Sequence, residues 1–170
     1  MPGQAKVITA LGIVTLIISV VLFYWSWGIY QLSGQTILDA QFFGRNVDMV
    51  DHVLGAYQGT GSPALYEKVQ RLDLLYPFAY GGFGVLWLYY VFKPSKWRFI
   101  CVVPAFSALF DLMENNLLAK ITEQYPVIDA DMVALSSTYT QLKYGLIVLS
   151  LIILFIGLAR RKKQRAASAG

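Results

Sequence analysis

Residues 133–163 have the sequence VALSSTYTQLKYGLIVLSLIILFIGLARRKK, an apolar run that ends in a cluster of basic residues. A helix needs about 20 predominantly apolar residues to cross the hydrocarbon core of a bilayer, and the run over 133–158 is longer than that. Three earlier stretches have the same character, over 7–30, 72–92 and 99–118. The sequence therefore predicts an all-α membrane protein built as a bundle of four transmembrane helices.

The bounds of the helices follow from capping residues at the ends of these runs. Ser62 is suited to the N-cap and Pro63 to the first helical position, so the second helix starts before its apolar run. Asp129 or Asp131 is suited to cap the fourth helix. We expect one transmembrane domain over 1–159, with helices over 7–30, 63–92, 99–119 and 131–159, followed by a basic, disordered cytoplasmic tail over 160–170.

The polar segment over 35–61, between the first two spans, carries a second kind of helical pattern. Phe43, Val47, Val50 and Leu54 recur at the spacing of one helical face. That pattern is typical of an amphipathic helix. We expect this outer segment to lie across the mouth of the bundle or in the membrane interface, as an extracytoplasmic element between the first and second transmembrane helices.

The composition excludes several classes of protein. Of the 170 residues, 56% are apolar and 14% are charged, and the mean hydropathy is +0.53. Soluble domains typically have a lower apolar fraction and a higher charged fraction than this. The length leaves room for about four crossings, which excludes a large transporter fold within one chain. A single cysteine, Cys101, excludes an internal disulfide and a cysteine-based metal cluster.

The distribution of basic residues predicts the orientation in the membrane. The net charge of +4 comes largely from the C-terminal cluster, so it does not indicate a nucleic-acid partner. Lysine and arginine gather on the cytoplasmic side of membrane proteins. Both termini are therefore expected in the cytoplasm of a multi-pass protein of the bacterial inner (plasma) membrane. The basic residues assigned to that side are Lys6, Lys93, Lys96, Arg98, Arg160, Arg161, Lys162, Lys163 and Arg165.

Ionisable residues within the predicted spans are the most informative feature for function. Asp111, Glu114 and Lys143 lie about 20–25 Å outward from the basic residues at the inner ends of their helices, at 1.5 Å per residue. They therefore share one depth in the outer leaflet, and helical spacing places them on faces with other polar residues. The predicted polar site consists of Asp73, Tyr76, Tyr80, Asp111, Glu114, Asn115, Thr140 and Lys143.

Two interpretations of this polar layer remain open. Lys143 with Asp111 or Glu114 can form a buried ion pair that only fixes the register of the helices. Alternatively, the layer lines a functional cavity, because one lysine cannot neutralise the acids there and an uncompensated buried charge is costly. Pro77 adds to the second interpretation, since its ring removes the hydrogen bond to the carbonyl of Asp73 and leaves a free acceptor.

Three classes of function fit these residues. The favoured one is binding of a lipidic or cationic ligand, or of a membrane partner, at the acidic site in the outer leaflet. The second is an intramembrane acid–base enzyme acting on a lipid or isoprenoid substrate. The third is an oligomeric ion or proton conductor. Expected partners are membrane lipids and either a second copy of the chain or another membrane protein. Neither a metal nor a cofactor is predicted, and His52 is assigned to a solvated helix face.

Overall fold

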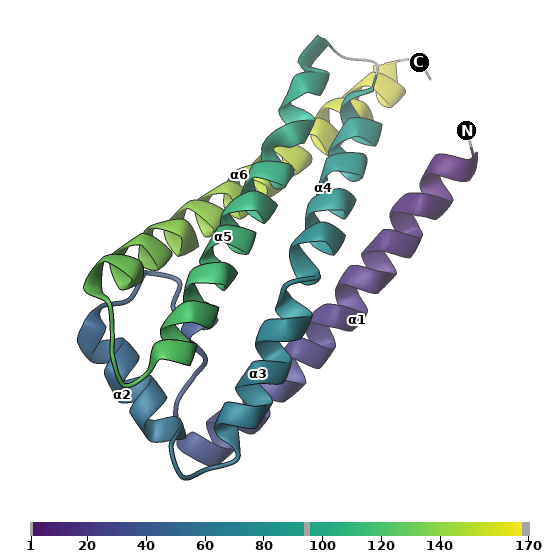
Figure 1. Ribbon diagram of the computed structural model, residues 1–170. Helices are drawn as coiled ribbons and strands as arrows, with labels where there is room; N and C mark the ends of the chain where they lie inside the picture. Colours follow the sequence, from purple (N-terminus) through teal and green to yellow (C-terminus); the bar gives the residue numbers. More distant parts are fainter. Residues whose placement is uncertain (1, 94–95, 168–170) are drawn as a thin grey trace.

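The computed structural model describes residues 2–93 and 96–167, and within them every regular element is helical (Figure 1). The chain forms the elements α1 (Pro2–Ser33), η1 (Leu38–Ala40), α2 (Val47–Tyr57), α3 (Ser62–Asp73), α4 (Tyr76–Phe92), η2 (Lys96–Val102), α5 (Val103–Gln124) and α6 (Ala130–Ala167). The prediction of an all-α chain is confirmed for the part that the structure describes.

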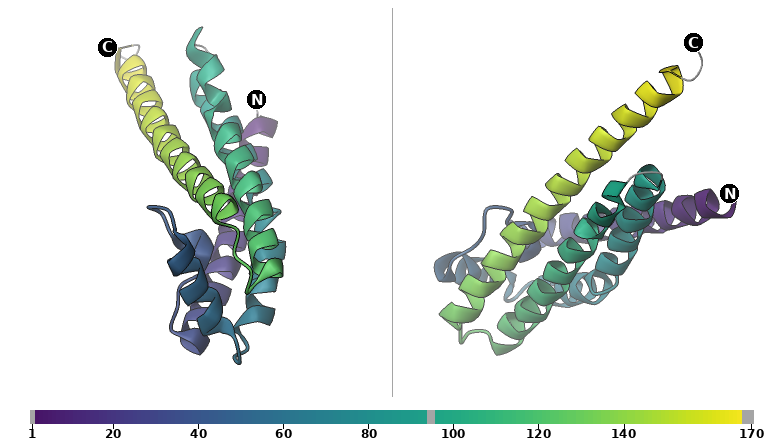
Figure 2. Two further views of the ribbon diagram at one scale, coloured as in Figure 1. Left: turned by 60° about the vertical axis from the view of Figure 1, so that its left-hand side comes forward. Right: turned by 90° about the horizontal axis from the view of Figure 1, so that it is seen from above.

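The long helices form an elongated bundle in which neighbours in sequence pack on each other. Helix α1 packs on α3 and α4, α4 packs on α5, and α5 packs on α6. Both termini lie at one end of the bundle, which we call the terminal end, whereas α2 lies at the other, the α2 end (Figure 1). Helix α6 crosses the others obliquely (Figure 2).

The second predicted helix, over 63–92, is two helices in the structure. Helix α3 ends at Asp73 and α4 begins at Tyr76, with Pro77 in its first turn. Proline cannot donate the hydrogen bond that would continue a helix through this point, so the chain turns between them. Ser62 is already the first residue of α3, and the preceding position is Gly61; the assignment of Ser62 as the N-cap is therefore wrong by one residue.

Within the described residues, three stretches are long and apolar enough to cross a membrane. They are Gly3–Ser33, Ser62–Phe92 and Ala130–Lys163, with mean hydropathies of 2.6, 1.2 and 2.4. The predicted span over 99–119 does not qualify. Its α-helix, α5, begins only at Val103 and carries charged and amide side chains that lower its hydropathy. Those side chains are buried in the bundle, as described below.

The outer segment contains one helix, shorter than the pattern predicts. Helix α2 begins at Val47 after Asn46, whose side chain accepts a hydrogen bond of 2.8 Å from the backbone N–H of Met49. Val50 and Leu54 are buried as expected, but Phe43 precedes the helix and is 97% exposed. The prediction that Phe43 belongs to the apolar face is wrong, because the Asn46 cap starts the helix after it.

The C-terminal basic residues are helical, in contrast to the predicted disordered tail. Asp129 caps α6 by accepting hydrogen bonds from the backbone of Asp131 and Met132, so the prediction of an aspartate cap is confirmed. The helix then continues to Ala167. Arg161 lies over the ring of Tyr90, 4.7 Å from its centroid, and donates to the Tyr90 carbonyl. This contact with α4 holds the end of α6 against the bundle.

Two separate apolar clusters form the core. The larger one lies toward the α2 end and joins residues such as Ile29, Tyr66 and Leu118 from several helices. The smaller lies toward the terminal end and includes Leu88 and Leu154. Between them, α3, α5 and α6 place polar residues inside the bundle. The predicted polar layer therefore occupies the gap between two apolar cores.

Candidate functional site

A network of ion pairs lies at the centre of this polar layer. Nζ of Lys143 lies 2.7 Å from Oδ1 of Asp111 and 2.7 Å from Oε2 of Glu114. Nη2 of Arg45 lies 2.7 Å from Oε1 of Glu114. No side chain in this network is more than 6% exposed. The prediction that Lys143 pairs with Asp111 or Glu114 is confirmed, and it pairs with both.

The facing surfaces of α5 and α6 hold this network in place. Asp111 and Glu114 lie about one turn apart on α5, and Thr140 and Lys143 do the same on α6. The hydroxyl of Thr140 donates to Oε1 of Glu114. The hydroxyl of Ser107, one turn before Asp111, donates to the backbone carbonyl of Lys143 at 3.0 Å. The two helices are thus joined by hydrogen bonds at several successive positions, which fixes their register.

Arg45 enters the network from a loop and was not among the predicted site residues. Its Nη1 donates to Oγ of Ser136 at 3.1 Å and its Nη2 to Oγ1 of Thr140 at 2.7 Å. The loop itself is tied to α6, because the backbone N–H of Arg45 donates to Ser137 at 3.0 Å. Gly44 allows the required turn with a φ of +94°. No periodicity marks a loop residue, so the only signal for Arg45 was the surplus of acids.

The carbonyl freed by Pro77 has a partner. Nδ2 of Asn115 donates to the backbone oxygen of Asp73 at 3.1 Å. The prediction that α4 lacks a normal hydrogen bond here is confirmed, since the helix breaks after Asp73. The prediction of a free acceptor is wrong, because α5 supplies an amide to it. Asn115 therefore acts as a link between α5 and the break between α3 and α4.

A cavity of about 310 Å³ adjoins the network. We call it the acidic cavity. It brings together five of the predicted site residues, whereas Glu114, Asn115 and Thr140 are buried outside its wall. Residues from the outer segment and from α6 complete the wall. The lining residues are Ile37, Asp39, Ala40, Asp73, Tyr76, Tyr80, Asp111, Lys143, Tyr144 and Ile147.

The tyrosines of this cavity combine aromatic faces with hydroxyl groups. The rings of Tyr76 and Tyr80 pack with their centroids 5.1 Å apart. The Tyr76 hydroxyl lies 2.9 Å from Oγ of Ser19, and that of Tyr80 lies 3.4 Å from Oγ of Ser107. Nζ of Lys143 lies 5.2 Å from the ring centroid of Tyr144. The wall can therefore contact a cation through ring faces as well as through carboxylates.

Two carboxyl groups of the layer have no ion-pair partner among the residues that the structure describes. Arg45 and Lys143 offset Asp111 and Glu114, but Asp39 and Asp73 remain. Each of these two residues is 8% exposed, and neither forms an ion pair with any residue that the structure describes. The acidic cavity thus has two buried carboxyl groups beyond those that the network neutralises.

Asp39 shows what this environment does to a carboxyl group. Its Oδ2 accepts a hydrogen bond of 2.9 Å from the hydroxyl of Tyr66. Burial raises the pKa of Asp39 above its usual range, and the negative charge of Glu114 raises it further. Lys143, the Tyr66 hydrogen bond and Arg45 oppose this shift but do not cancel it. A positively charged group entering the cavity would favour the ionised form of Asp39.

The described residues contain no cluster of metal-ligating side chains. Across residues 2–93 and 96–167, no three or more carboxylate, histidine or cysteine side chains are grouped so as to hold a metal ion. The chain matches no protein family model, and no curated protein or solved structure is significantly similar to it. The function is therefore argued from the geometry of the cavity alone.

Proposed function

We propose that this chain is an integral membrane protein that binds the positively charged group of an organic ligand in the acidic cavity. The observation that carries this proposal is the pair of buried carboxyl groups, Asp39 and Asp73, on the cavity wall without ion-pair partners among the described residues. An uncompensated carboxylate in a low-dielectric site is costly. An ammonium group would offset that cost and would also contact the tyrosine rings.

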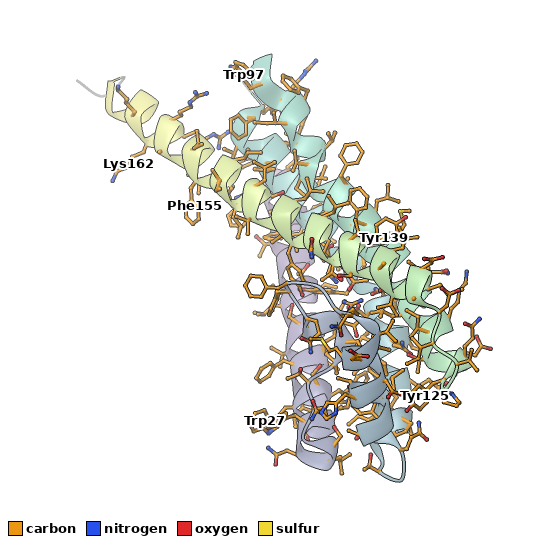
Figure 3. All side chains as sticks on the ribbon, turned by 90° about the vertical axis from the view of Figure 1, so that its left-hand side faces the viewer. Trp27, Trp97, Tyr125, Tyr139, Phe155 and Lys162 are labelled. Carbon is orange, nitrogen blue, oxygen red and sulfur yellow. The ribbon has the colours of Figure 1, made fainter. Side chains whose placement is uncertain are left out.

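The surface of the bundle supports placement in a membrane. Large apolar side chains are exposed on every long helix, including Phe23 on α1 at 72% and Phe155 on α6 at 67%. Phe155 points away from the bundle in Figure 3. Soluble monomers rarely expose apolar patches of this extent. Lipid tails are the environment in which such a surface is stable.

The same surface supports four crossings, with α5 as the additional span. Helix α5 has 22 residues, which at 1.5 Å each is about 33 Å, enough to cross the hydrocarbon core. Its ionised side chains at the centre are paired with Lys143 of α6 and with Arg45 of the loop before α2. Polar residues within spans are tolerated in that position. Low hydropathy is therefore compatible with a span that is protected by its neighbours.

Aromatic and basic residues at the two ends support the orientation predicted from the sequence. Figure 3 shows Trp27 and Tyr125 near the α2 end and Trp97 and Lys162 near the terminal end. Tryptophan and tyrosine gather at both membrane interfaces, and lysine and arginine gather on the cytoplasmic side. The terminal end is then cytoplasmic and the α2 end is outside. The acidic cavity opens within the outer half of the bundle.

The described part of the structure does not support conduction of ions or protons. An apolar cluster separates the polar layer from the terminal end in the described residues, so no continuous polar path leads there. This apolar cluster consists of Leu88, Val91, Phe92, Cys101 and Leu154.

Acid–base catalysis stays a prediction, since nothing in the geometry specifies a reaction.

Binding of a short organic cation tests the proposal. Hexylammonium should bind the purified protein in lipid nanodiscs, measured by calorimetry, whereas hexanol and hexanoate should not. Asp73→Asn should weaken hexylammonium binding at least about tenfold, because it removes one buried charge partner. This variant breaks no ion pair in the described residues, so it should keep its melting temperature.

The matched control is Asp48→Asn, the same change on the exposed surface of α2. It should leave hexylammonium affinity unchanged. Equal affinity in wild type and Asp73→Asn would contradict the proposal, as would binding of hexanol as tight as that of hexylammonium. The first result would show that the acidic wall does not select the ligand, and the second that charge does not matter.

A further inference from the structure

A second cavity continues from the acidic one along the bundle. It has a volume of about 130 Å³, and its wall shares Tyr80 and Ile147 with the acidic cavity. Beyond these two residues it is lined mainly by apolar side chains of α4 and α6, among them Phe83, Trp87 and Leu151. We call it the inner groove. It places an apolar surface next to the acidic cavity.

We propose that the ligand is a single-chain amphiphilic amine, with its ammonium group in the acidic cavity and its hydrocarbon chain in the inner groove. This inference rests on the proposed function and adds the class of ligand to it. From Tyr80 to Leu88 the groove follows α4 for about 12 Å at 1.5 Å per residue. That length matches about nine carbons at about 1.5 Å per C–C bond, and a groove of about 130 Å³ encloses part of such a chain.

The two serine hydroxyls in the groove wall already have partners. The hydroxyl of Ser107 donates to the carbonyl of Lys143, and that of Ser150 donates to the carbonyl of Leu146 at 2.7 Å. Neither hydroxyl needs a partner from a ligand. A hydrocarbon chain can therefore lie against these serines without leaving their hydroxyl groups unpaired.

The direction of the groove matches the polarity of a lipid. It runs from Tyr80 toward the terminal end, since α4 ascends in that direction (Figure 1). In the proposed orientation this leads from the outer leaflet toward the middle of the bilayer. A head group in the acidic cavity and a tail in the groove would thus point the same way as the surrounding outer-leaflet lipids.

A larger apolar cavity of about 620 Å³ on the other side of η1 is the competing place for a tail. It shares Ile37 and Ala40 with the acidic cavity and is lined by Phe23, Trp27 and Tyr30 of α1. Trp27 lies near the α2 end (Figure 3). In the proposed orientation that end is the outer interface, where head groups gather. We therefore assign the tail to the inner groove.

Two serine variants distinguish the two apolar cavities. Ser150 lines the inner groove, and Ser26 lines the larger apolar cavity beside α1. Each hydroxyl donates at 2.7 Å to the carbonyl four residues earlier in its own helix, so Ser150→Phe and Ser26→Phe are matched changes. Binding of hexylammonium and dodecylammonium is measured in nanodiscs, with empty nanodiscs subtracting partition into lipid. Melting temperatures identify variants that are misfolded.

Wild type should bind dodecylammonium at least about tenfold more tightly than hexylammonium, from the additional methylenes buried. Ser150→Phe should abolish this gain, whereas Ser26→Phe should leave both affinities unchanged. Equal affinity for the two amines in wild type would overturn the inference while the proposed function stands. Loss of the gain in Ser26→Phe alone would overturn it as well. If neither amine binds, the proposed function itself fails.

Discussion

Replacing Lys143 with methionine should destabilise the protein more than replacing Arg45, although both cations are buried. Lys143 is the only ion-pair partner of Asp111 among the described residues, whereas Glu114 has Arg45 as well. Lys143→Met therefore leaves Asp111 buried without a cation, which costs about 3–5 kcal/mol. Arg45→Met leaves each carboxylate in contact with Lys143, so no carboxylate of the pairs is left without a cation.

A second substitution identifies which carboxylate carries the cost. In the Lys143→Met background, Asp111→Asn should restore much of the lost stability, because the pair of Arg45 and Glu114 remains balanced. Glu114→Gln should not, since it leaves Asp111 unpaired and also removes the partner of Arg45. Asp111→Asn and Glu114→Gln each neutralise one carboxylate of α5, so each variant is the control for the other.

Thermal unfolding in detergent, followed by intrinsic fluorescence, measures these differences. For a chain of this length 1 kcal/mol shifts the melting temperature by roughly 2–4 °C. Lys143→Met should therefore lower it by roughly 6–20 °C. Equal restoration by Asp111→Asn and Glu114→Gln would refute the reasoning, because it would mean that the layer responds to net charge and not to these particular contacts.

Two further predictions concern the loop and the topology. Gly44→Ala should lower the melting temperature more than Gly34→Ala, because both glycines have positive φ but only the added Cβ at Gly44 meets α6 side chains; equal losses would show that the loop holding Arg45 is not tightly anchored. In a Cys101→Ser background of intact cells, a cysteine at Gly59 should react with an impermeant maleimide and one at Lys162 should not; the reverse pattern would invert the orientation.

Much of the fold could be predicted because apolar periodicity is a strong local signal. The runs over 7–30 and 131–159 correspond to α1 and α6, and Asp129 caps α6 as expected. The features that were predicted wrongly depend on contacts between residues that are distant in sequence. The end of α6 stays helical where Arg161 reaches Tyr90 of α4. Such a contact between helices leaves no pattern in either helix alone.

The candidate site shows the same division between local and distant signals. Helical spacing and depth were enough to bring Asp111 and Lys143 together, since both lie on regular helices. Arg45 and Asp39 lie outside the long helices, and their positions depend on how one loop folds over α6. Counting charges indicated that one lysine could not neutralise the acids, but not that Arg45 would join the layer.

The structure also explains why both a structural and a functional interpretation of the polar layer fitted the sequence. The ion pairs of Arg45 and Lys143 with α5 balance two carboxylates and tie the loop, α5 and α6 together, which is a structural role. Asp39 and Asp73 contribute nothing to that balance, yet they are buried on the wall of a cavity. Fixed register does not require these two carboxyl groups, since neither takes part in the ion pairs that join the helices. Their presence on the wall of the acidic cavity is therefore the strongest reason to assign the cavity a ligand.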